Sequence, residues 1–131
     1  MKNMLFTALA ALMLSTPAFA EVVVVVNPAN ADAVSKDAIA NVFLGKSTAF
    51  TPIDQADGSA IRGEFYKKVA DKDAAQAKAV WSKLVFTGKA TPPKEVGSSA
   101  DVKKAVAANP KGIGYIEKSA VDASVKVVLT P

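Results

Sequence analysis

The chain has 131 residues, of which 50% are hydrophobic, and 16 Lys and Arg against 12 Asp and Glu give a formal net charge of +4. This length supports one small domain with a globular composition. Cysteine and histidine are absent, which excludes disulfides, thiolate nucleophiles, Ser-His-Asp triads and the usual zinc sites. We therefore expect no enzyme, no metal site and no cofactor.

The N-terminus has the features of a bacterial secretory signal peptide. Lys2 provides the positive charge, residues 5–14 are apolar except for Thr7, and Ala18-Phe19-Ala20 is a small-x-small cleavage site. A membrane anchor is the alternative, but ten apolar residues are too short to cross about 30 Å of hydrocarbon as a helix. We expect residues 1–20 to be removed and residues 21–131 to form a periplasmic domain without a membrane span.

The mature chain begins with a strand pattern and a helix pattern. Val22–Val26 is an unbroken β-branched run, typical of a strand that is buried on both faces. Ser35 is a predicted N-cap, followed by apolar residues at helical spacing up to Gly45. Further strands are expected at residues 52–54, 112–117 and 124–129, and further helices after Ser59, over residues 77–85 and after Ser99.

The helix over residues 77–85 has the clearest apolar stripe. Ala77, Val80, Trp81, Leu84 and Val85 recur at helical spacing, so this stripe should face the core. We expect Trp81 to pack against the sheet, and Phe86 also to be a core residue. Strands separated by helices predict an α/β fold with a central mixed sheet flanked by about four helices.

Basic residues concentrate in the middle of the chain, which can indicate an anionic partner. Most of these lysines fall on the polar faces of amphipathic helices, so a solvated surface is the favoured explanation. The sequence contains one arginine and no interleaving of aromatic and basic residues. A nucleic-acid partner is therefore not expected.

The segment 57–62, Asp-Gly-Ser-Ala-Ile-Arg, follows a short strand and opens a helix. The first backbone N–H groups of a helix lack intrahelical acceptors and carry partial positive charge, so they can bind an anion. The Ser59 hydroxyl would add a donor and Arg62 a countercharge. An ordinary N-cap with a surface arginine gives the same pattern. Asp54 and Asp57 are a weaker candidate acid–base pair, which nothing places around a substrate.

Several sequence segments together resemble one lobe of the phosphate-binding protein of phosphate ABC transporters. They are residues 23–27, 35–46, 57–59 and 109–116, and they follow the order of that family. Short, single-lobe exported proteins of this kind also contain the phrases at residues 62–66 and 81–88. The similarity extends over nearly all of residues 22–129.

The resemblance implies a single periplasmic-binding-protein-like lobe that binds phosphate or a similar oxyanion for ABC-type uptake. The implied partners are a small anion, an ABC transporter permease and a second copy of the chain that completes the cleft. The ligand-binding residues it implies are Asp57, Gly58, Ser59, Ala60, Ile61 and Arg62, with Asn27 and Gln55 as further candidates.

The sequence departs from the family pattern in this segment. Ala60 and Ile61 replace small and hydroxyl residues, and Gln55 stands where the family has a phosphate-binding arginine. Backbone donors survive such changes, whereas a fixed guanidinium does not. The departures favour the alternative of a periplasmic interaction or adapter module that has lost ligand capture.

Overall fold

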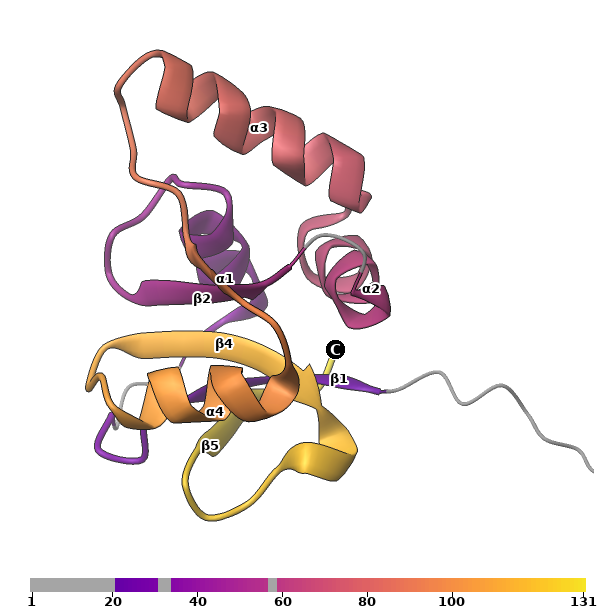
Figure 1. The fold of residues 1–131 in the computed structure, drawn as a ribbon, viewed down its shortest axis with the longest axis vertical. Helices are drawn as coiled ribbons and strands as arrows, with labels where there is room; N and C mark the ends of the chain where they lie inside the picture. The colour runs from indigo at the N-terminus through magenta and orange to yellow at the C-terminus, as the bar shows by residue number, and fades with distance from the viewer. Residues whose placement is uncertain (1–20, 31–33, 57–58) are drawn as a thin grey trace, which may run out of the picture.

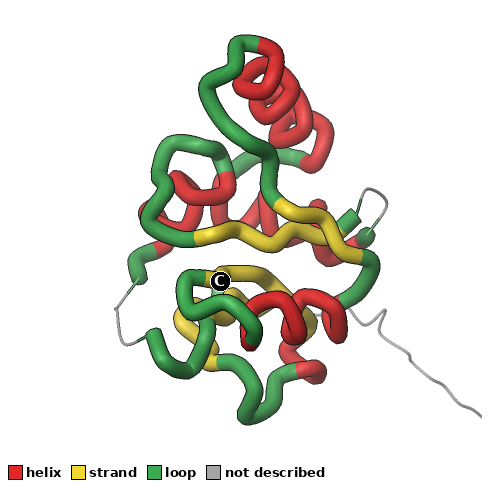
Figure 2. The backbone as a smooth tube through the Cα atoms, turned by 60° about the vertical axis from the view of Figure 1, so that its left-hand side comes forward, coloured by secondary structure: helices red, strands yellow, loops and turns green. Residues whose placement is uncertain are grey.

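The computed structural model describes residues 21–30, 34–56 and 59–131. The predicted signal peptide and the predicted site residues Asp57 and Gly58 lie outside these ranges. The elements are β1 (Val22–Val26), α1 (Lys36–Phe43), β2 (Thr51–Gln55), α2 (Ala60–Ala70), α3 (Ala74–Phe86), β3 (Lys94–Val96), α4 (Ser99–Ala107), β4 (Gly112–Glu117), a 3-10 turn (Lys118–Ala120) and β5 (Lys126–Leu129). Figures 1 and 2 show these helices arranged around one sheet.

The five strands form one mixed sheet in the order β3-β2-β4-β1-β5. β2 runs parallel to both β3 and β4, whereas β1 is antiparallel to β4 and β5. The five valines of β1 are at most 2% exposed. The predicted α/β class, mixed sheet and doubly buried first strand are therefore confirmed.

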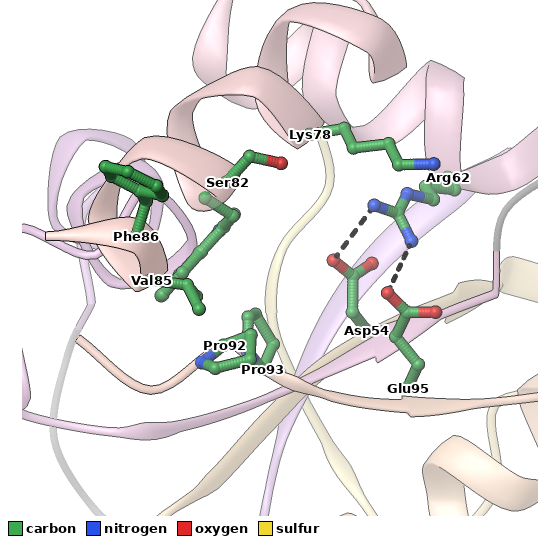
Figure 3. A pocket seen from close by; sticks show the side chains of 10 residues that line it. Asp54, Arg62, Lys78, Ser82, Val85, Phe86, Pro92, Pro93 and Glu95 are labelled. Carbon is green, nitrogen blue, oxygen red and sulfur yellow. Dashed lines mark ion pairs between the residues drawn. The ribbon is translucent and has the colours of Figure 1, made fainter. Parts of the chain in front are cut away.

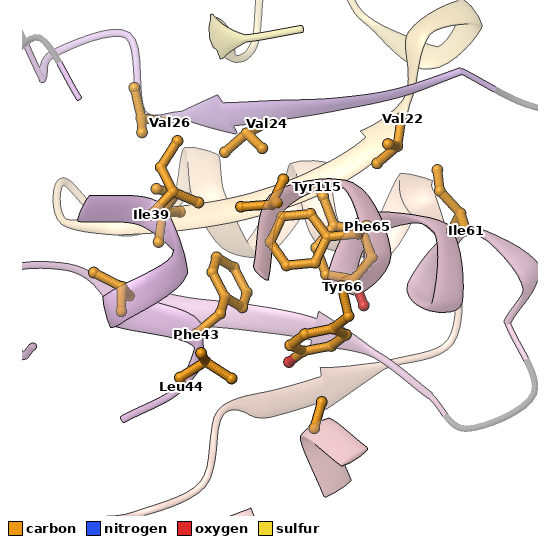
Figure 4. Packing of buried hydrophobic residues seen from close by; sticks show 14 residues of the cluster. Val22, Val24, Val26, Ile39, Phe43, Leu44, Ile61, Phe65, Tyr66 and Tyr115 are labelled. Atoms are coloured by element: carbon orange, nitrogen blue, oxygen red, sulfur yellow. The ribbon is translucent and has the colours of Figure 1, made fainter. Parts of the chain in front are cut away.

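Each face of the sheet carries a separate apolar cluster. On one face, Val22, Val24 and Val26 pack with α1 and α2 around an aromatic group, shown in Figure 4. That group comprises Phe43, Phe65, Tyr66 and Tyr115, with the rings of Phe65 and Tyr115 stacked at 4.1 Å. On the other face, Val23 and Val25 pack with Val102 and Val106 of α4. The alternation along β1 thus divides its valines between two layers of helices.

Trp81 packs differently from the prediction. Its indole Nε1 donates to the Phe43 carbonyl oxygen at 2.6 Å, and its ring lies beside Gly45. Phe43 is the last residue of α1, whose final carbonyls lack intrahelical donors, so this contact closes the end of that helix. Trp81 is buried, with its indole against the end of α1.

The prediction that Val85 and Phe86 face the core is wrong. They are 46% and 92% exposed, whereas Trp81 and Leu84 of the same helix lie against Gly45 at the end of α1. In Figure 1, α3 stands at the end of the molecule away from β5. The sequence prediction also missed the short strand β3, which follows Pro92 and Pro93.

No helix within the described residues has the length and apolar character needed to cross a membrane.

Replacing Gly45 by Ala should destabilise the protein. Gly45 has φ +78°, and a Cβ there would lie 2.5 Å from Leu84 Cδ1. The left-handed backbone alone costs a non-glycine residue about 1–2 kcal/mol. Gly63→Ala is the matched control, because Gly63 lies inside α2 with nothing near its Cβ position, and alanine there should stabilise by up to about 1 kcal/mol. Urea denaturation that ranks the two variants in the opposite order would contradict this account of the α1–α3 contact.

Candidate functional site

The carboxyl ends of the parallel strands β2, β3 and β4 meet at one edge of the sheet. α2 begins shortly after β2, and α4 begins shortly after β3, so two helix N-termini lie at this edge. Ligands of open α/β sheets commonly bind at such an edge, where helix N-termini favour anions. We call this region the carboxyl edge.

Gln55 links the two helix N-termini. Its Nε2 donates to the Tyr115 carbonyl at 3.1 Å and to Ser99 Oγ at 3.3 Å, and its Oε1 accepts from Ser59 Oγ at 3.0 Å. Gln55 is 3% exposed. The residue at the family's arginine position is therefore a buried connector between β2, β4, α2 and α4.

The two predicted serine caps differ from expectation. Ser59 occupies the N-cap position of α2, but its side chain makes no capping hydrogen bond, and its hydroxyl donates to Gln55 Oε1 instead. The N-cap of α4 is Ser98, whose Oγ accepts from the Asp101 N–H. Ser99 is the first helical residue and its hydroxyl accepts from Gln55 instead. Since the Ser59 hydroxyl has one proton, the remaining donors at the start of α2 are backbone N–H groups.

Arg62 is buried, at 4% exposed, and its guanidinium contacts β2 and β3. Nη1 donates to the Gln55 carbonyl at 2.7 Å and lies 3.4 Å from Glu95 Oε2, while Nη2 lies 4.0 Å from Asp54 Oδ2 (Figure 3). The guanidinium carbon lies 5.8 Å from the centre of the Tyr66 ring. Arg62 is therefore not the surface arginine of the ordinary N-cap alternative, and its guanidinium pairs with two carboxylates of the sheet.

Asp54 is the centre of a buried polar cluster that the sequence prediction missed. Its carboxylate accepts from the hydroxyls of Tyr66, at 2.6 Å, and Tyr115, and from the Gln55 backbone N–H at 2.9 Å. Burial raises the pKa of Asp54, against the lowering effect of the two tyrosine hydrogen bonds and of the Arg62 charge. Burial and the nearby carboxylate also raise the pKa of both tyrosines, which therefore remain donors.

An aspartate directly after a buried strand residue was the available signal for this cluster. Asp54 follows the buried Ile53 in β2, but its partners lie 12 and 61 residues further along the chain. The weaker expectation of an acid–base pair with Asp57 cannot be assessed, because Asp57 lies outside the described residues.

Asn27 lies at the opposite edge of the sheet from the other candidates. Its Nδ2 donates to the carbonyls of Val106 and Ala107 at 3.1 and 3.0 Å, and its Oδ1 accepts from the Ala29 N–H. These bonds close the C-terminal end of α4. Asn27 is therefore not brought together with the residues of the carboxyl edge, because β1 is antiparallel to β4.

Within the described ranges, no group of three or more Asp, Glu, His or Cys side chains is placed to hold a metal ion. The start of α2 offers backbone N–H groups at Ala60 and Ile61, while the Arg62 N–H donates to the Ser59 carbonyl at 3.1 Å. This arrangement can bind an anion through the backbone, and the residues that the structure describes at the carboxyl edge include no nucleophile–base pair.

Solved structures share this fold. Residues covering 82% of the chain superpose on 45% of an ABC-type phosphate transport receptor from Vibrio cholerae, with a TM-score of 0.64 and 18% identity. They also superpose on 44% of a protein from Clostridium perfringens described as a phosphate ABC transporter substrate-binding protein with bound phosphate, with a TM-score of 0.66 and 22% identity. The chain has a periplasmic-binding-protein fold.

A third similar structure is a possible phosphate binding protein from Planctomyces limnophilus, with a TM-score of 0.57 and 15% identity over 82% of this chain and 40% of that one. The chain thus spans less than half the length of these proteins, consistent with a single lobe. No protein-family model matches the sequence, and no curated protein matches it. The resemblance seen in the sequence is therefore confirmed at the level of the fold.

Replacing Asp54 by Asn should destabilise the protein in a pH-dependent way. The amide cannot accept from both tyrosines and leaves Arg62 without its buried partner, a loss of about 1–3 kcal/mol. The folded-state pKa of Asp54 lies above 3.8, so the stability that the parent gains from this group is complete below pH 3.8 and declines as the pH rises through the raised pKa. The free energy of unfolding of the parent should therefore exceed that of the variant by less and less as the pH rises over that range.

Chemical denaturation of both proteins from pH 3.5 to pH 7 measures this difference in the free energy of unfolding. The contributions of the other titrating groups, which both proteins share, cancel in the difference. A difference that stays constant, or grows with pH, would contradict a raised pKa at this buried carboxyl.

Proposed function

We propose that the protein is an exported solute-binding module that holds phosphate or a similar oxyanion at the carboxyl edge. The single observation that carries this proposal is the convergence of the N-termini of α2 and α4 at that edge. Likeness in fold to proteins whose names specify phosphate transport supports the same ligand class. Export through a signal peptide would give a mature N-terminus at Glu21.

The proposed anion site lies at the start of α2. The backbone N–H groups of Ala60 and Ile61 are the donors, and Ser59 is the N-cap residue that precedes them. Arg62 supports the site because its guanidinium donates to the Gln55 carbonyl. The Gln55 side chain in turn joins the starts of α2 and α4 through Ser59 and Ser99. A helix N-terminus that is open to water binds an anion weakly and is sensitive to added salt.

Half of a two-lobed protein leaves any ligand exposed on one side. We propose that a second copy of the chain or the permease of an ABC transporter covers the carboxyl edge when solute is delivered. Because enclosing an anion excludes water and strengthens each of its hydrogen bonds, affinity of the isolated chain should be low.

A periplasmic interaction or adapter module is the second candidate function. The observation that favours it is that the Ser59 hydroxyl and the Arg62 guanidinium, two side chains expected to contact the anion, are both engaged by the protein itself. In this alternative, the carboxyl edge is a structural remnant and the lobe serves as a binding partner for another protein.

Phosphate binding is tested by following backbone amides in NMR spectra while inorganic phosphate or sulfate is added at constant ionic strength, with chloride as the control. We expect the amides of Ala60 and Ile61 to shift at millimolar phosphate. Ala60→Pro should lower the affinity about tenfold, because proline is tolerated at the first helical position but lacks the N–H that binds the anion. Ser59 already has the extended backbone that precedes a proline.

Ala74→Pro is the matched control, because Ala74 is the first residue of α3 and follows an N-cap that is also extended. It should leave phosphate binding unchanged. If the NMR signals of the amides at the start of α2 do not shift at millimolar phosphate, the anion site is rejected and the adapter function is favoured.

A further inference from the structure

A groove of about 440 Å³ lies between the last three turns of α3 and the segment that leads into β3. Figure 3 shows that its two ends differ in chemistry. One end is formed by Val85, Phe86, Pro92 and Pro93, and the other by charged residues. The groove shares Arg62 with the support of the proposed anion site, but Gln55, Ser59, Ala60 and Ile61 are not among the described residues that line it.

The apolar end exposes an unusual amount of hydrophobic surface. Phe86 is 92% exposed and Val85 46% exposed, and both line the same groove beside the ring of Trp81. Isolated apolar side chains on a surface are common, but apolar side chains gathered along a concave site are typical of a ligand pocket. This end of the groove therefore suits an aliphatic or aromatic group.

The charged end presents both signs from opposite walls. The exposed ammonium of Lys78 comes from α3, and the carboxylate of Glu95, whose side chain is 51% exposed, comes from β3. Below them, the buried Arg62 is paired with Asp54 and Glu95. An ammonium has three donors and a carboxylate several acceptor positions, so both groups can bind a ligand in addition to their protein contacts.

We propose that this groove binds a free amino acid with an apolar side chain. The ligand's carboxylate would pair with Lys78, its ammonium with Glu95, and its side chain would lie along Val85 and Phe86. A simple oxyanion is disfavoured by the carboxylates at the charged end, and a purely apolar ligand would make no use of the two exposed charges there. The volume falls within the range of small-molecule sites, about 300–1,000 Å³. The inference is independent of phosphate binding.

Trp81 is the single tryptophan of the chain and lines the groove, so its fluorescence reports directly on occupancy. We expect L-leucine and L-phenylalanine to change the emission and to shift the backbone amides of residues 82–86 and 94–96. Leucinamide, which has only the ammonium, and N-acetyl-leucine, which has only the carboxylate, represent the two ends of a peptide. Each should bind at least several-fold more weakly than leucine.

Lys78→Gln and Phe86→Ser should each weaken leucine binding several-fold without affecting the fold, since both residues are exposed. Lys83→Gln is the control, because Lys83 is an exposed lysine of the same helix that is not among the described residues lining the groove. No amide shift with either amino acid at millimolar concentration, or equal binding of leucine and its two analogues, would overturn the proposal.

Discussion

The buried carboxylate of Asp54 is the constraint on which the arrangement of the molecule depends. A charge inside a small core is costly unless it is paired and hydrogen-bonded. Here the donors come from α2, through Tyr66 and Arg62, and from β4, through Tyr115. Satisfying this one group therefore fixes α2 against two neighbouring strands, and the same contacts hold the start of α2 at the carboxyl edge.

This use of Arg62 also determines what the carboxyl edge can offer a ligand. The guanidinium lies over Asp54 and Glu95, which are neighbours across the β2–β3 pair, so it stabilises the sheet. Gln55, at the position of the family's arginine, joins Ser59 to Ser99. The donors that remain for an anion are those of the backbone. In the proposed function, Gln55 and Arg62 therefore position the anion site and do not contact the anion.

The sequence predicted those parts of the structure that depend on local patterns. The valine run of β1, the Ser35 cap and the stop at Gly45 each follow from the chemistry of a few adjacent residues. The β4 strand was likewise predicted with its observed bounds.

Features that depend on long-range packing were not predictable in this way. The Asp54–Tyr115 contact depends on the register of β2 against β4, which no local pattern reveals. The apolar stripe of α3 correctly indicated a helix, but whether Val85 and Phe86 are covered depends on how far α1 and α2 extend beneath them. Ser99 was predicted as a cap because adjacent serines compete for that position, and only the structure shows that Gln55 binds the second one.

A double-mutant cycle between Tyr66→Phe and Tyr115→Phe tests the central role of the Asp54 cluster most directly. Each variant removes one hydroxyl and keeps the ring, so the apolar packing of the aromatic group is retained. Because both hydroxyls bind the same carboxylate, the account predicts that losing both lowers the free energy of unfolding at pH 7 by at least about 0.5 kcal/mol more than the sum of the single losses. Additive losses would contradict the claim that one shared carboxylate holds α2 to the sheet.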